Sequence, residues 1–533
     1  MKKSINVVLT ASFILLAVFS SIYSYAVPKK RILKVDIKSS TVELSKMPLV
    51  CIGAGRAHEG LMADWQRQLT EVQQECNFKY IRFHGLFSDD MGVFKIYDGK
   101  VHYNFMYVDA LYDFLLSIHI RPLVELGFMP EALASGKKTI FWWKGNVTLP
   151  SSFDEYSKFI QAFVEHITKR YGEDEIKKWY FEVWNEPNLS AFFDAEQADY
   201  FKLYKVASES IKSVNADYRV GGPATAGLAW VPEFISFTKK NNVPLDFITT
   251  HAYGVEGALD EYGTQDNFLV KNPLCIPDGL AETRKQIIDA GEKDMELHIT
   301  EFNSSYSPAD PIHDTYQNAT YLLNVLKNSI GHATSMSYWT FTDIFEEPGT
   351  VDKPFHGGFG LINFQNIRKP SFYAYSFYNK LFKNKISVND DGKGNDTQDD
   401  LLNYWITKNS NNEVSALIYD FTMPNQGKKG NKTYFTQLHP SYNKGVIELE
   451  LNNMDDGKYV LELQSVGYMC HDAQSLYLKM GSPKDLTISQ EHMLRETAIS
   501  SPESSIAIVK NGKTTIRLSR ENNKFYLIRL LKI

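Results

Sequence analysis

Polar and aromatic side chains stand at the carboxyl ends of five short apolar segments of the chain. The five ends are Arg82-Phe-His84-Gly85, Trp184-Asn185-Glu186-Pro187, Thr250-His251-Ala-Tyr253, Thr300-Glu301-Phe-Asn303 and Tyr338-Trp339-Thr-Phe341. Two of them carry a glutamate, Glu186 and Glu301. When two carboxyl groups are held close together, one pKa rises, so that one group stays protonated near neutral pH while the other is ionised. An acid and a nucleophile of this kind can act together on one glycosidic bond.

The positions of the two glutamates suit the retaining route of glycoside cleavage. That route requires two carboxyl groups about 5–5.5 Å apart, one to protonate the leaving group and one to attack the anomeric carbon. Glu186 and Glu301 lie about three strand–helix units of roughly 40 residues apart, on facing sides of a small barrel mouth. A single glutamate at a strand end is more often a solvated loop residue. The two motifs together favour Glu186 as general acid/base and Glu301 as nucleophile.

Three further side chains at the same segment ends are candidates for contacts with a sugar. Asn185 precedes the proposed acid, and its amide suits a hydrogen bond to a sugar 2-hydroxyl, although an Asx turn is the plain alternative. Tyr253 suits a hydrogen bond that keeps Glu301 ionised, and Trp339 suits a stacking platform below the sugar. For both aromatic residues the alternative is a place in the hydrophobic core.

The remaining candidates are two histidines and two acidic residues. His84 and His251 are either sugar contacts or satisfied core histidines. They are scattered in sequence and no H-x-x-x-H helix is present, so we expect neither a metal nor another cofactor. Glu346 and Glu347 follow the eighth apolar segment, where they either reach hydroxyls of the bound sugar or belong to a solvated loop.

Eight short apolar segments, most of them bounded by Gly, Pro or polar residues, would position these side chains. They are Leu49–Gly55, Lys79–Gly85, Arg121–Gly127, Lys178–Glu186, Arg219–Thr225, Asp246–Tyr253, Glu296–Asn303 and Ser335–Phe341. Helical patterns lie between several of them, as from Tyr156 to Ile167, where apolar residues recur at helix spacing. This alternation predicts an α/β fold, a (β/α)8 TIM barrel whose active site lies at the carboxyl ends of the strands. A doubly wound open sheet is the alternative, but it normally has fewer strands and a Gly-rich phosphate turn.

Beyond the barrel the hydrophobic period changes to two. We expect the last barrel helix from Phe372 to Phe382 and a turn-rich linker from Asn389 to Asp396. The strands that follow are expected at Leu401–Thr407, Glu413–Phe421, Val446–Leu451, Lys458–Val466, Thr514–Leu518 and Phe525–Leu530. The sequence therefore predicts a catalytic barrel over residues 49–385 and an accessory all-β sandwich over residues 386–533. Alternation in Arg31–Ile37 predicts that residues 27–48 add a strand to the sandwich.

Composition and charge restrict the class of partner. The chain has 533 residues, of which 43% are hydrophobic and 13% aromatic, so it can bury a large core and still present flat aromatic faces in a sugar-binding cleft. Its net charge of −6 argues against nucleic acid or an anionic membrane surface as the main partner. We expect an oligosaccharide substrate, and the sequence leaves open whether the protein forms a homo-oligomer.

Residues 1–26 have the pattern of a signal peptide. Lys2 and Lys3 precede an apolar stretch from Ile5 to Phe19, and a small-x-small cleavage site ends at Ala26. We expect export and a secreted or periplasmic protein; an uncleaved membrane anchor is the alternative. Export permits disulfides, but the four cysteines form no C-x-x-C pair and a domain of this size does not need them, so we expect buried free thiols.

Longer motifs around the candidate residues resemble those of glycoside hydrolase family 39. Phe181-Glu-Val-Trp-Asn-Glu-Pro-Asn-Leu189, followed by Phe192-Phe193, resembles the acid/base motif of that family. Ile299-Thr-Glu-Phe-Asn-Ser-Ser-Tyr-Ser-Pro308 resembles its nucleophile motif. Supporting stretches are Gly53–Ala57, Tyr80–Phe87, Val124–Pro130, Phe141–Val147 and Pro354–Leu361. The Asn-Glu-Pro triplet alone is shared by a wider clan, whereas the combination is specific to the family.

The resemblance implies a retaining glycosidase without a metal cofactor, from a family that includes β-xylosidases and α-L-iduronidases. It carries the acid/base onto Glu186 and the nucleophile onto Glu301. It carries the sugar contacts onto His84, Asn185, His251, Tyr253, Trp339 and Glu346 or Glu347.

We therefore expect a secreted retaining exo-β-xylosidase that releases xylose from non-reducing ends of xylo-oligosaccharides. A uronic acid would need Arg or Lys beside its carboxylate, and no pair of basic residues near the segment ends is aimed at one point. The run Phe141-Trp-Trp143 would close the pocket where a hexose carries its extra CH2OH group. The alternatives are an iduronidase, arabinosidase or galactosidase activity, an endo-acting enzyme with an open groove, and a carbohydrate-binding protein without catalysis.

Overall fold

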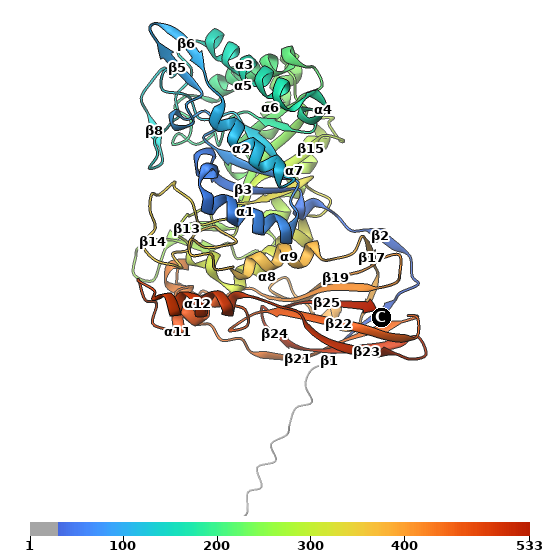
Figure 1. The fold of residues 1–533 in the computed structure, drawn as a ribbon. Coiled ribbons are helices and arrows are strands. Elements are labelled where there is room, and N and C mark those ends of the chain that lie inside the picture. Colours follow the sequence, from blue (N-terminus) through green and yellow to red (C-terminus); the bar gives the residue numbers. More distant parts are fainter. Residues whose placement is uncertain (1–29) are drawn as a thin grey trace, which may run out of the picture.

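The computed structural model describes residues 30–533, and the segment expected to be a signal peptide lies outside this range. A helix-covered barrel forms one part of the structure, and two packed β-sheets lie beneath it (Figure 1). Within the described range, no helix combines the length and the hydropathy that a membrane-spanning segment needs.

Eight parallel strands close into the barrel in the order β10-β11-β12-β15-β16-β3-β4-β7. They are β3 (Cys51–Arg56), β4 (Tyr80–His84), β7 (Arg121–Glu125), β10 (Tyr180–Glu182), β11 (Arg219–Thr225), β12 (Phe247–Tyr253), β15 (Glu296–Asn303) and β16 (Ser335–Tyr338). Each strand overlaps one of the eight predicted segments, and the predicted fold class is confirmed. Because all eight strands run the same way, their carboxyl ends meet at one mouth of the barrel.

Helices follow the strands and cover the outside of the barrel. They are α1 (Ala63–Cys76), α2 (Met106–Ser117), α3 (Phe153–Tyr171) with the short α4 (Glu173–Ile176), α5 (Gln197–Val214), α6 (Val231–Asn241), α7 (Cys275–Asp289), α8 (Tyr316–Ser329) and α9 (Pro370–Asn379). In α3 the local sequence sets both ends: the Ser152 side chain accepts a hydrogen bond from the Glu155 N–H, and Gly172 takes φ +86° after the last turn. Phe159 and Phe163 lie on its buried face.

The barrel interior changes character along the strands. Near the amino ends it holds an apolar cluster of Cys51, Leu123, Tyr180 and Phe247. Nearer the carboxyl ends it holds charged side chains, since Arg82, Glu125 and Glu182 are all at most 1% exposed. Buried charges are rarely tolerated unless they are paired, so this upper layer already marks the mouth as the site of chemistry.

The second part of the structure consists of a four-stranded and a seven-stranded sheet. The first has the order β18-β1-β21-β24 and the second β2-β17-β19-β20-β25-β22-β23. Their strands are β1 (Lys30–Asp36), β2 (Thr41–Glu43), β17 (Asn384–Ile386), β18 (Val388–Asp390), β19 (Asp400–Lys408), β20 (Val414–Thr422), β21 (Asn443–Asn452), β22 (Gly457–Val466), β23 (Glu503–Val509), β24 (Lys513–Glu521) and β25 (Phe525–Lys532). β1 pairs in parallel with β21, and its Leu33 and Val35 enter the apolar core of the sheets together with Leu449.

Two details of this part differ from the expectations. The stretch expected as a linker begins inside β18, and its Asp390 and Asp396 hold the nearly buried Arg31 at 2.6 and 2.5 Å. The part is also not purely β, because it carries the helices α10 (Asn431–Tyr434), α11 (Ala473–Lys479) and α12 (Ile488–Ala498).

The four cysteines are free, but only Cys51 and Cys76 are buried, so the expectation of buried thiols is wrong for Cys275 and Cys470.

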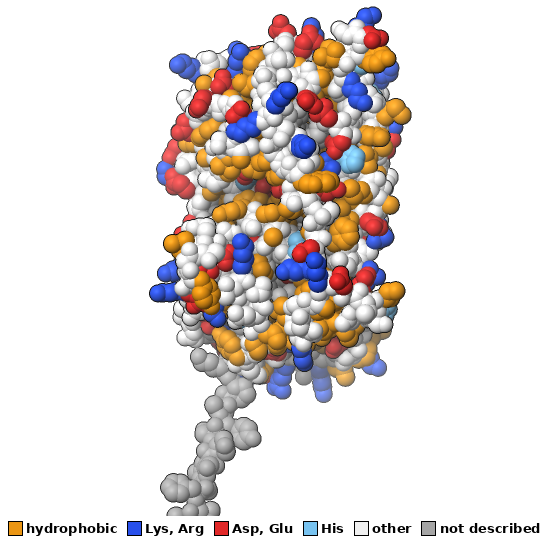
Figure 2. Space-filling model, turned by 90° about the vertical axis from the view of Figure 1, so that its left-hand side faces the viewer, with side chains coloured by type: hydrophobic (Ala, Val, Ile, Leu, Met, Phe, Trp, Pro, Cys, Tyr) orange, Lys and Arg blue, Asp and Glu red, His pale blue; other side chains and the backbone are white. Residues whose placement is uncertain are grey.

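Three hairpins extend the loops around the barrel mouth (Figure 1). They are β5 (Phe94–Tyr97) with β6 (Lys100–Tyr103), β8 (Thr139–Ile140) with β9 (Gly145–Asn146), and β13 (Val255–Leu259) with β14 (Gln265–Leu269). Figure 2 looks onto the face that carries these hairpins, and hydrophobic side chains gather across its middle, where the surface is hollowed.

Candidate active site

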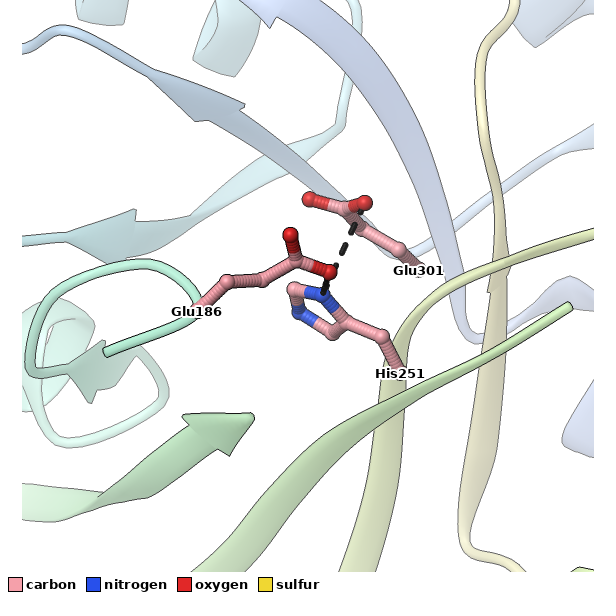
Figure 3. A group of neighbouring side chains, drawn as sticks. All are labelled: Glu186, His251 and Glu301. Carbon is pink, nitrogen blue, oxygen red and sulfur yellow. Dashed lines mark hydrogen bonds and ion pairs between the residues drawn. The ribbon is translucent and has the colours of Figure 1, made fainter. Parts of the chain in front are cut away.

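Glu186 lies in a sharply turned loop that follows β10. Trp184 and Glu186 both have positive φ, at 72° and 43°, a backbone conformation that costs energy for any residue except glycine. The Glu186 N–H donates to the Ala224 carbonyl of β11 at 2.8 Å, and Trp184 Nε1 donates to the Phe192 carbonyl at 2.9 Å. These bonds hold the loop so that the Glu186 carboxyl points toward Glu301 (Figure 3), and the residue as a whole is only 7% exposed.

Glu301 lies within β15, and two donors hold its carboxylate. Arg82 Nη1 donates to Glu301 Oε1 at 2.5 Å, and the Tyr253 hydroxyl donates to Oε2 at 2.7 Å. These two contacts hold both oxygens of the carboxylate in place. Tyr253 has the contact with Glu301 that was expected from the sequence.

The two carboxyl groups face each other at short range. One oxygen of Glu186 and one of Glu301 lie within 4.8 Å of each other and of His251 Nδ1. This spacing matches the retaining arrangement of about 5–5.5 Å and not the inverting one of about 6.5–9.5 Å. Burial raises the pKa of Glu186 to about 7, an effect that Arg82 opposes and Glu125 reinforces. Glu186 can therefore carry a proton near neutral pH, directly across from the Glu301 carboxyl group.

Three polar side chains around the pair are held by hydrogen bonds. Asn185 Oδ1 accepts from Arg82 Nη2 at 2.9 Å, which leaves the Asn185 NH2 group for a ligand. His251 Nδ1 lies 2.9 Å from Glu186 Oε1, and burial lowers the pKa of this histidine. His84 Nδ1 lies 2.6 Å from Glu125 Oε2, and burial and Arg82 lower its pKa to about 3. Both histidines are therefore neutral under ordinary conditions.

A cavity of about 440 Å³ opens above the two glutamates. It is lined by His84, Asn185, Glu186, Leu189, Phe192, Ala226, Gly227, Tyr253, Val255, Glu301, Tyr306, Trp339, Glu347 and Phe359. The structure thus brings together seven of the nine residues proposed from the sequence. The other two, His251 and Glu346, do not line the cavity: His251 is fully buried behind Glu186, and Glu346 faces the opposite side of its loop.

The consecutive residues Glu346 and Glu347 have different surroundings. The Glu346 carboxylate pairs with Arg56 at 2.5 Å, and its N–H donates to Glu59 Oε1 at 2.8 Å. The Glu347 carbonyl accepts from the Trp142 N–H at 2.9 Å, while its carboxyl group enters the cavity. Burial, followed by the charge of Glu301, raises the pKa of Glu347 well above its ordinary value. Of the pair left open by the sequence, Glu347 is the one placed to meet a sugar.

Arg82 is the functional residue whose role the sequence did not reveal. It is 0% exposed and lies 2.9, 2.7 and 2.5 Å from the carboxyl groups of Glu125, Glu182 and Glu301. Glu125 and Glu182, also missed, occupy paired positions on neighbouring barrel strands. The available signal was their place at the carboxyl ends of apolar strands, where a charged side chain is unusual.

The group Glu186, His251 and Glu301 is also the kind of cluster that can hold a metal ion. Both Glu301 oxygens, however, already accept hydrogen bonds from Arg82 and Tyr253. A metal ion would have to displace these donors and sit beside a guanidinium group, whose charge repels a cation. The donor set therefore suits proton transfer better than metal binding.

The run Phe141-Trp-Trp143 does not form the wall that the sequence suggested. None of the three residues lines the cavity. Phe141 stacks behind the His84 ring, with centroids 6.1 Å apart, and Trp142 is 60% exposed on the far side of the Glu347 loop. The inner wall is formed instead by Trp339 and Phe359.

Comparison with known proteins places this geometry in a family. The family model described as "Glycosyl hydrolases family 39" matches residues 31–515. A β-xylosidase of Caldicellulosiruptor saccharolyticus is 37% identical to this chain, and the match covers 92% of this chain and 97% of the relative. A β-xylosidase of Geobacillus stearothermophilus is 43% identical, and that match covers 62% of this chain and 68% of the relative. The crystal structure of a monomeric β-xylosidase from Caulobacter crescentus CB15 superposes with a TM-score of 0.89 at 38% identity, covering 94% of this chain and all of the other. This chain is a glycoside hydrolase that acts on O-glycosyl bonds, and it belongs to glycosyl hydrolases family 39.

Proposed function

We propose that the protein is a retaining exo-β-xylosidase in which Glu186 is the general acid/base and Glu301 the nucleophile. The observation that carries the proposal is the short separation of their carboxyl oxygens, within 4.8 Å, at the carboxyl ends of the barrel strands. The β-xylosidases among its relatives support xylose as the sugar released.

The reaction would run in two displacements. In the first, Glu301 attacks the anomeric carbon while Glu186 gives its proton to the glycosidic oxygen; the C1–O bond breaks, the alcohol leaves, and a glycosyl ester forms on Glu301. In the second, Glu186 takes a proton from water, the water oxygen attacks the anomeric carbon, and the ester bond to Glu301 breaks. The Tyr253 hydroxyl and Arg82 stabilise the carboxylate that is regenerated.

The lining of the cavity favours a neutral sugar over a uronic acid. No Lys or Arg is among the described residues that line it. Arg82 lies nearest, but its guanidinium is taken up by Glu182, Glu301 and Asn185. The carboxylate of an iduronide would be desolvated beside Glu347 without a counter-charge, which disfavours this alternative.

Cleavage from the end of a chain is supported by the closed side of the cavity beyond Glu347. There the Trp142 N–H donates to the Glu347 carbonyl, which joins the loop of Trp142 to the loop of Glu347. An endo-acting enzyme would need an open groove at this position for the rest of the sugar chain. A second support is Phe345, which packs edge-on against both Trp339 and Phe359 and thickens this wall.

A panel of nitrophenyl glycosides, followed by proton NMR of the first product, tests the proposal. We expect xylosides to be cleaved faster than glucosides, galactosides, arabinosides or iduronides. The preference over the two hexosides should be roughly 10- to 200-fold, because the wall of Trp339 and Phe359 would block their extra CH2OH group. The first xylose released should be the β anomer, because two displacements at one carbon restore its configuration. An α product would exclude the double displacement, and comparable kcat/KM on another glycoside would exclude xylose as the preferred sugar.

We further propose that the protein is exported and acts outside the cytoplasm. The support is the sequence pattern of residues 1–26, which lie outside the described part of the chain. Fractionation of the producing cells and amino-terminal sequencing test this proposal, with Val27 expected as the first residue. An intact amino terminus on enzyme in the cytoplasmic fraction would contradict it.

A further inference from the structure

We propose that the half of the cavity beside Glu186 is a binding slot for a flat, apolar leaving group, in particular an aromatic aglycone, and that Tyr306 is its platform. The inference rests on the proposed function, because it takes Glu186 as the acid that protonates the leaving group. It goes beyond that function by assigning the chemistry of the group that the enzyme releases together with xylose.

The position of Glu186 decides which half of the cavity receives the leaving group. A general acid must reach the glycosidic oxygen, so the aglycone lies on its side. The Leu189 N–H donates to the Glu186 carbonyl at 3.0 Å, which places Leu189 in the same loop. Asn188 joins this loop to the next one through two bonds with the Ala226 backbone, at 3.0 and 2.9 Å. These loops therefore form the aglycone wall.

The two halves of the cavity differ in chemistry. His84, Asn185 and Glu347 bring polar groups to the cavity, and Trp339 brings a flat ring, so we assign these residues to the sugar. Six further lining residues are uncharged, and we assign them to the aglycone half: Leu189, Phe192, Ala226, Gly227, Val255 and Tyr306. The backbone N–H and carbonyl of Ala226 are already bonded to Asn188. This half therefore offers contact area and few hydrogen bonds, which suits an aromatic ring better than a second hydroxylated sugar.

Tyr306 lines the cavity and lies beside Tyr253, which contacts the proposed nucleophile. Its ring lies 6.2 Å from that of Tyr253 at an interplanar angle of 87°, and the Tyr253 hydroxyl bonds to Glu301. The side chain of Tyr306 is 52% exposed, and that of Leu189 is 39% exposed. Large apolar side chains left open at the rim of a cavity indicate a surface that a ligand covers. Tyr306 is therefore placed to stack on a planar group that leaves the site.

Two xylosides with leaving alcohols of nearly equal acidity separate binding in the slot from leaving-group chemistry. We expect kcat/KM for benzyl β-xyloside to exceed that for methyl β-xyloside by about 10-fold or more, an aromatic contact of about 1.4 kcal/mol. Tyr306→Ala should lower this ratio about 5-fold, whereas Tyr306→Phe should keep it because the ring remains. Tyr262→Ala, which removes a 76% exposed tyrosine from the turn between β13 and β14, is the matched control.

The outcomes separate this inference from the proposed function. A benzyl-to-methyl ratio near one, or equal losses on both substrates in Tyr306→Ala, would overturn the slot even if both xylosides are cleaved. Cleavage of another glycoside in place of xylosides would overturn the choice of sugar, and the same ratio, measured with the benzyl and methyl glycosides of that sugar, would still decide the slot. Unchanged thermal unfolding of Tyr306→Ala excludes misfolding as the cause of a lower ratio.

Discussion

Raising the pH through 7 should remove the catalytic proton from Glu186 and with it the activity. Burial raises the pKa of this carboxyl from its ordinary value of 4.5 to about 7. At pH 6 a carboxyl with the ordinary pKa would be protonated in roughly 3% of molecules, and one with a pKa of about 7 in roughly 90%. The buried position therefore supplies about 30 times more of the competent acid at pH 6.

The sign of the effect follows from the role of the group. An acid is needed in its protonated form, so kcat/KM should fall about tenfold per pH unit above the pKa of Glu186. The assay is the pH profile of kcat/KM, which reports groups of the free enzyme, on an alkyl xyloside whose leaving group needs protonation. The alkaline midpoint is expected near pH 7.

Glu186→Ala provides the matched test. On dinitrophenyl xyloside, whose leaving group departs without a proton, this variant should lose the alkaline limb while keeping much of its first-step rate, and added azide should speed its turnover. On alkyl xylosides it should be severely impaired. A midpoint at or below about pH 5.5 in the wild type, or an unchanged alkaline limb in Glu186→Ala, would refute the assignment.

Three further perturbations address the rest of the site. Glu301→Ala should lose roughly 10⁴-fold or more in rate, on the order of 5 kcal/mol, and a mechanism-based fluorosugar should label Glu301 in the wild type; mass spectrometry of the labelled peptide checks this. Arg82→Met leaves three buried carboxyl groups without their counter-charge, so it should destabilise the fold by about 3–5 kcal/mol and lower the midpoint of thermal unfolding. The control is Arg67→Met, which removes an exposed ion pair and should leave the midpoint unchanged. Glu347→Ala should lower kcat/KM about 2- to 10-fold through the loss of a hydrogen bond between its neutral carboxyl group and the sugar. Glu346 lies outside the cavity, so Glu346→Ala should have a smaller effect, and equal effects would contradict the assignment of Glu347.

The barrel could be predicted from the sequence because its strands are buried on both faces. Such strands appear as short apolar runs ended by polar residues, and β11 and β15 have the predicted bounds to the residue. The mouth hairpins could not be predicted in this way, because β13 has almost no buried side chain and so no alternation to read. Helix α12 was missed for the same reason: only Leu494 and Ala498 are buried.

The candidate site could be predicted as far as residue type and strand position decide it. Glu186 and Glu301 follow from two motifs at strand ends, and the structure brings their carboxyl groups together. The distinction between Glu346 and Glu347 could not be made, because it depends on Arg56 at the end of β3, which is far away in sequence. The role of Arg82 was hidden for a similar reason, since its carboxylate partners come from three other strands.

The pairing of β1 with β21 also sets the order in which the molecule can fold. Leu33 is aligned with Leu449, so the first described strand finds its parallel neighbour only after roughly 400 further residues have been synthesised. All eight barrel strands lie between these two partners, and the barrel can close while β1 still has an unsatisfied edge. Docking of β1 is then a late, long-range step that ties the beginning of the chain to its end. A chain interrupted before Asn443 leaves an apolar strand exposed beside a finished barrel, which marks incomplete molecules for aggregation or proteolysis.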